Sequence, residues 1–91
     1  MKLEDALFHW LQMKLVCDAR PEDQAAKETL AFFAQILEED HQLLRFALSA
    51  ADDREYTVSY ENVTGSQCLR FDRDLAEQLL RDIESNPKFN Q

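Results

Sequence analysis

The feature that most constrains the fold is a segment in which two alternating stretches flank the only glycine of the chain, Gly65. Apolar and polar residues alternate over residues 56–61, and Leu69 and Phe71 resume the alternation after the glycine. Period-two alternation in β-favouring residues predicts strands, and a glycine between two such stretches predicts a tight turn. We therefore predict a β-hairpin whose turn lies at residues 63–66.

A capped helix is predicted directly after this hairpin, over residues 73–84. Asp72 is placed to cap its first turn, and Glu77 and Arg81 form a supporting pair four residues apart. Residues 85–87 end the helix, and residues 86–91 are expected to form a frayed tail. The apolar residues expected on its buried face are Leu75, Ala76, Leu79, Leu80 and Ile83.

Residues 42–49 fit two structures. Their leucines and alanines would continue a preceding helix, whereas Leu44, Phe46 and Leu48 alternate as a strand does. We choose the strand because a two-stranded hairpin alone is weak, and a turn at residues 52–54 would join a third strand to it. The prediction is a three-stranded antiparallel meander.

The first helix is predicted over residues 2–17, and its apolar residues cover more than half of its circumference. A helix that packs on one core needs only a stripe. Either this helix is buried from two sides within the fold, or part of it faces another chain. In the second case Phe8, Trp10 and Leu11 are the candidate anchors of a homodimer.

A second helix is predicted over residues 21–40, with one apolar face that includes Phe32 and one acidic face. Residues 21–41 carry six acids and one lysine, a net charge of −5. A solvated helix face is the default explanation for this charge, and Glu28, Glu38 and Glu39 are the candidates for contact with a basic partner. The fold class is therefore α+β in the order α-α-β-β-β-α, as a single domain over residues 1–91.

The charge balance excludes several classes of partner. The chain carries 18 Asp and Glu against 10 Lys and Arg, a net charge of −8. Such a surface repels phosphate backbones and anionic membranes, so we expect neither nucleic-acid nor membrane binding. No signal peptide or membrane-spanning run is recognisable, which favours a cytoplasmic location, where Cys17 and Cys68 would be free thiols packed as small core residues.

No catalytic pattern is recognisable in the sequence. A single glycine excludes the glycine-rich loops that cradle phosphates, and no serine lies in a nucleophile elbow. Glu38 and His41 have the spacing of half a di-iron motif, but His9 lacks a matching glutamate. We therefore expect no metal, no cofactor and no enzymatic activity, with His41 interacting with neighbouring acids and His9 on the surface.

Three functional hypotheses follow. The first is an interaction or regulatory module that binds a protein partner or a second copy of itself. The second is a small-molecule-binding domain with its site between sheet and helices, near Tyr56, Tyr60 and Cys68. The third is an acidic mimic of nucleic acid that occupies a basic protein.

Overall fold

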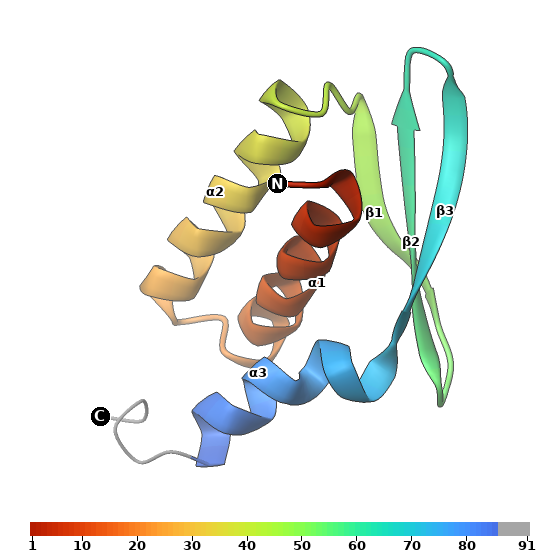
Figure 1. Cartoon of the computed structure of the whole chain (residues 1–91). Helices are drawn as coiled ribbons and strands as arrows, with labels where there is room; N and C mark the ends of the chain where they lie inside the picture. The colour runs from red at the N-terminus through yellow and green to blue at the C-terminus, as the bar shows by residue number, and fades with distance from the viewer. Residues whose placement is uncertain (86–91) are drawn as a thin grey trace.

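The computed structural model describes residues 1–85 and has the predicted order of elements, so the α+β fold class is confirmed (Figure 1). The predicted tail lies outside the described residues. The elements are α1 (Leu3–Ala19), α2 (Gln24–Glu39), β1 (Arg45–Ala51), β2 (Glu55–Asn62), β3 (Gly65–Asp72) and α3 (Arg73–Ser85).

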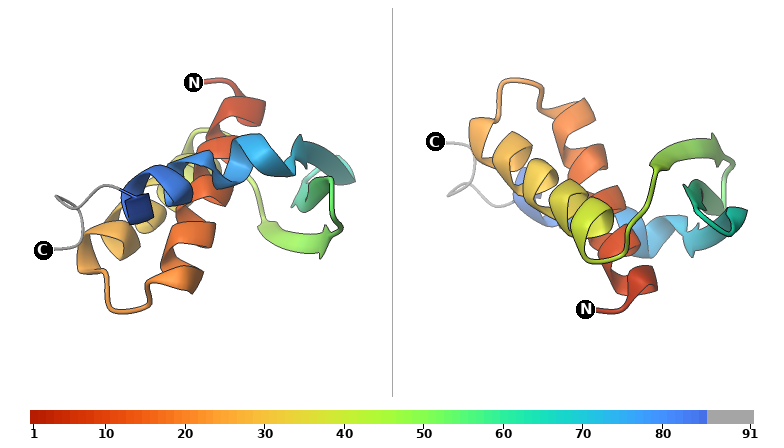
Figure 2. Two further views of the ribbon diagram at one scale, coloured as in Figure 1. Left: turned by 90° about the horizontal axis from the view of Figure 1, so that it is seen from below. Right: turned by 90° about the horizontal axis from the view of Figure 1, so that it is seen from above.

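The three strands form one antiparallel sheet in the order β1-β2-β3. The helices lie on one side of it, and Figures 1 and 2 show no described element across the opposite face. Tyr56, Val58 and Tyr60 of β2 point to the helices and are buried, whereas the intervening residues Thr57 and Ser59 belong to the open face. Alternation along β2 therefore separates a core face from an open face, as the sequence predicted.

The strand predicted over residues 42–49 exists, but β1 begins at Arg45. The reason lies at the end of α2. Gln42 has a positive φ of 56°, and the N–H of Leu43 donates to the carbonyl of Leu37. A residue with a left-handed backbone, followed by an N–H that donates to a carbonyl in the last turn, is a common way for a helix to end. Residues 42 and 43 therefore belong to the C-terminal cap of α2 and not to the strand.

Both turns of the sheet are fixed by residues that the sequence analysis placed there. The Asp52 carboxylate accepts hydrogen bonds from the backbone N–H groups of Arg54 and Glu55, at 2.8 and 2.7 Å. Gly65 has a φ of 137°, a conformation that favours glycine. These turns fix the register of β2 against β1 and β3.

Helix α1 is the centre of the core. It packs against both α2 and α3, and its aromatic side chains reach the sheet, where Trp10 contacts Phe46 and Phe8 contacts Phe71. The apolar circumference of α1 is therefore explained by burial from several sides within one chain. The buried residues that form the core cluster are Ala6, Leu7, Trp10, Leu11, Leu37, Leu43, Tyr56, Val58, Tyr60, Phe71 and Ala76.

A cluster of polar contacts around Glu77 connects helix α3 to the sheet. The Asp72 carboxylate caps the helix by accepting from the N–H of Leu75 at 3.0 Å, as predicted. The Tyr56 hydroxyl donates to Glu77, and the Arg73 guanidinium donates to the same carboxylate at 2.9 Å while lying over the Tyr56 ring. The cluster joins the start of β2 to the first turns of α3.

This cluster makes stability depend on pH in the acid range. The hydrogen bond from Tyr56 is the main cause that lowers the pKa of Glu77 below its ordinary value of 4.5, and Arg73 adds to it against the opposing effect of burial. A carboxyl whose pKa is lower in the folded state contributes stability that is present above the ordinary value and is lost as the pH falls through the folded value. The Glu77 contribution is therefore present at neutral pH and disappears in acid.

We expect Glu77→Gln to lower the free energy of unfolding at pH 7 by about 1–2 kcal/mol, and to lower it less at about pH 3, which is below the ordinary pKa of 4.5. Urea denaturation at both pH values measures this difference. Glu55→Gln, which removes a carboxylate from an exposed residue of β2, is the control. Equal differences between wild type and Glu77→Gln at the two pH values would contradict the assigned role.

Candidate functional site

The three candidate anchors on α1 do not form a surface. Trp10 is 7% exposed and Leu11 is fully buried, and both belong to the core of the single chain. Phe8 is half-buried against Phe71, with ring centroids 5.6 Å apart. Two of the three side chains are thus inaccessible to a second chain.

The outward face of α2 has a different composition from the one predicted. Phe32 was assigned to the apolar, core-facing side, but its side chain is 57% exposed, so that assignment was wrong. Its neighbour Phe33 takes the inward position and stacks on His9, with ring centroids 5.3 Å apart. Consecutive residues of a helix point about 100° apart, so Phe32 must then point outward.

We define the α2 outer face as Glu28, Phe32, Gln35, Ile36 and Glu39. These residues recur at helical spacing, within about 60° of Phe32 around the helix axis. A hollow of about 230 Å³ opens here, lined by Phe32, Gln35, Ile36, Glu39 and Asp40. The hollow follows the groove between two rows of side chains on α2, the kind of groove into which a second helix packs.

The charges of this face are uncompensated. Glu28 and Glu39 of this face, and Asp40 at the end of the hollow, are exposed, and within residues 1–85 none of them makes a salt bridge. Glu38, the third predicted acidic residue, is exposed but lies about 120° from Phe32 around the helix. The structure therefore brings Glu28 and Glu39 together with an exposed aromatic ring and leaves Glu38 on the flank.

The residues expected to bind a ligand between sheet and helices do not converge. The Tyr56 and Tyr60 side chains are buried on the helix side, and their hydroxyls donate to Glu77 and Gln67. Cys68 is exposed on the open face, opposite Ser59 in the register, so its assignment as a core residue was wrong. These three side chains therefore cannot line one pocket.

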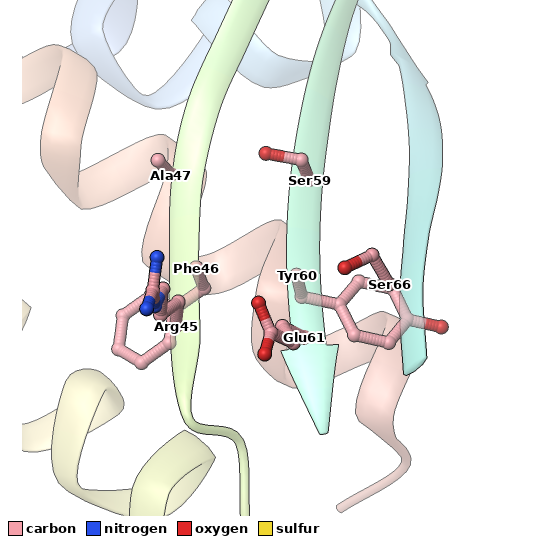
Figure 3. A pocket seen from close by; sticks show the side chains of 7 residues that line it. All are labelled: Arg45, Phe46, Ala47, Ser59, Tyr60, Glu61 and Ser66. Carbon is pink, nitrogen blue, oxygen red and sulfur yellow. The ribbon is translucent and has the colours of Figure 1, made fainter. Parts of the chain in front are cut away.

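A second hollow, of about 200 Å³, lies on the open face of the sheet (Figure 3). Arg45 and Glu61 face each other across β1 and β2 there. The hollow is smaller than the roughly 300–1,000 Å³ of typical small-molecule sites. It is a shallow, open hollow and not an enclosed cavity. The residues that line it are Arg45, Phe46, Ala47, Ser59, Tyr60, Glu61 and Ser66.

The histidines and cysteines form no cluster that suggests chemistry. Among residues 1–85, no group of three or more His, Cys, Asp or Glu side chains is placed to hold a metal ion. His9 is half-buried, with Nδ1 3.2 Å from the Gln12 side-chain oxygen, and Nε2 of His41 is buried without a hydrogen-bond partner among the described residues. Cys17 is half-buried, and burial raises the pKa of its thiol.

Among the described residues, no helix has the length and apolar character needed to cross a membrane. Comparison with protein-family models, with curated proteins and with solved structures finds no match to this chain.

Proposed function

We propose that the protein is a non-enzymatic interaction module that binds a basic segment of a partner protein on the α2 outer face. The observation that supports this most directly is the exposure of Phe32 between unpaired carboxylates. Burying a phenylalanine side chain completely is worth about 1.5–3 kcal/mol. Phe32 is 57% exposed, so a partner that covers the ring recovers the part of this energy that the fold leaves unused.

The arrangement has the anatomy of a binding hot spot. Such sites combine an aromatic anchor at the centre with a polar rim that excludes water once the partner is bound. On α2 the exposed ring of Phe32 forms the apolar centre beside the half-buried side chain of Ile36, which also packs on the core, and Glu28 and Glu39 form the rim. A segment with an apolar residue between basic residues complements this pattern.

The dimensions of the face define the partner further. Glu28 and Glu39 are eleven positions apart on the helix, which at a rise of 1.5 Å per residue is about 16 Å. Two basic groups separated by this distance can approach both carboxylates at once. The acidic rim also steers a basic partner during its approach, because the field of several unpaired charges extends about 10 Å at moderate salt.

The test is quantitative capture of proteins from native cells on immobilised wild-type protein and on Phe32→Ala. We expect a basic partner that binds wild type and loses roughly 30-fold or more in affinity with Phe32→Ala, the loss of a hot-spot residue. Leu75→Ala is the matched control, because Leu75 is a 63% exposed apolar residue on α3. Equal binding of every partner by wild type and Phe32→Ala would refute the proposal.

Phe32→Ala also distinguishes the proposed module from an acidic mimic of nucleic acid. A mimic is recognised through its carboxylates, so charge reversal would weaken it while Phe32→Ala would have little effect. An apolar anchor makes the proposed module sensitive to both changes.

A further inference from the structure

The two edges of the sheet differ in how they are protected. β1 carries an irregularity in its register between Leu48 and Ala50, and bulges of this kind disfavour pairing with another strand. β3 lacks most of the usual protections, and its only charged residues are Arg70 and the terminal Asp72. It pairs with β2 in unbroken register from Gly65 to Asp72, and it contains no proline, no lysine and no bulge.

The outer edge of β3 is also uncovered. α3 leaves the end of β3 and runs back beneath α1, so in both views of Figure 2 no described element lies along this edge. The two-residue turn places Asn62 opposite Gly65. With the usual alternation of an antiparallel ladder, the N–H and C=O groups of Ser66, Cys68 and Arg70 then point away from β2.

The charge of β3 favours a second copy of this chain as the partner. Two chains of charge −8 repel each other over most of their surface. Residues 65–71 contain no acid and one cation, Arg70. This edge is therefore a place where two copies approach without opposing carboxylates.

We propose that β3 pairs antiparallel with β3 of a second copy, about a two-fold axis at Cys68, to form a six-stranded sheet. In this register Cys68 lies opposite its own copy, and Arg70 lies opposite Ser66 of the second copy, so like charges are not paired. The ladder ends at Gly65 and Phe71, before Asp72, whose carboxylate caps α3. One self-complementary contact thus gives hydrogen-bond partners to the free N–H and C=O groups on the β3 edge of each copy.

This inference rests on the sheet edge and is independent of the proposed role of α2. Figure 1 shows α2 and β3 on opposite sides of the molecule. A dimer through β3 would leave the α2 outer face of each copy accessible.

The test combines the mass of the assembly with a cross-link. Native mass spectrometry of wild type is expected to give twice the chain mass of 10.7 kDa. Directly paired residues of an antiparallel ladder have Cα atoms about 5.5 Å apart, within the range of a disulfide. In a Cys17→Ser background, mild oxidation with copper–phenanthroline is therefore expected to link the two chains through Cys68.

Cys68→Lys keeps the surface polar but places two ammonium groups opposite each other, so we expect a monomer with an unchanged circular dichroism spectrum. Cys68→Ser is the matched control and is expected to remain a dimer. A monomeric wild type at micromolar concentrations overturns the inference. So does a dimer that survives Cys68→Lys, or one in which Cys68 fails to cross-link.

Discussion

Replacing Trp10 by alanine is expected to lower the free energy of unfolding by about 3–5 kcal/mol. The side chain is 7% exposed, and its ring meets Phe46 edge to face at 5.4 Å, so its removal leaves a cavity between α1 and β1. Small domains have about 5–15 kcal/mol of stability in total, and the variant would therefore be close to unfolding. Urea denaturation followed by circular dichroism measures the change, because Trp10 is the only tryptophan and its fluorescence is lost with it.

Leu75→Ala is the appropriate comparison, because Leu75 is 63% exposed and its truncation should change stability by no more than about 0.5 kcal/mol. The Trp10 result also distinguishes a core residue from an interface residue. A Trp10→Ala protein of full stability that had only changed its oligomeric state would contradict the core role and indicate that α1 is an interface.

The second large effect is expected from reversing the rim charges of the α2 outer face. Glu28→Lys combined with Glu39→Lys should slow association with the partner by roughly tenfold or more at low salt, because a repulsive rim replaces an attractive one. The difference between variant and wild type should shrink as salt is raised toward 1 M, where charges are screened beyond about 3 Å. Surface plasmon resonance at several salt concentrations measures both expectations.

The control for this experiment is Asp53→Lys combined with Glu55→Lys. Both residues are exposed, and both lie near the β1–β2 turn, which Figure 1 shows away from α2. The change in net charge is the same. If the control slows association as much as the α2 variant, the effect belongs to net charge and the α2 outer face has no special role.

The order of elements could be predicted from the sequence because local signals determine it. Alternation around Gly65, the cap at Asp72 and the aspartates between β1 and β2 each act over a few residues, and each is found where the pattern placed it. The start of β1 was missed by three residues, because the end of α2 depends on the positive φ of Gln42, which no local signal predicts.

The candidate site was harder to predict because it depends on which of two adjacent apolar residues faces the core. Phe32 and Phe33 are equally apolar, and only the packing of Phe33 on His9 decides that Phe32 points outward. Leu75 was likewise assigned to the buried face of α3 and is exposed, while Ala76 takes the inward position. The sequence pattern also left open whether the wide apolar surface of α1 was core or interface. The structure shows that α2, α3 and the sheet together cover it.

The most direct test of the α2 outer face is an amide NMR titration of the isotope-labelled protein with the partner captured by wild type. We expect chemical-shift changes to concentrate on α2 between Glu28 and Asp40 and to be absent when the titrated protein is Phe32→Ala. Changes concentrated on the open face of the sheet or on α3, with the α2 signals unmoved, would show that the partner binds elsewhere.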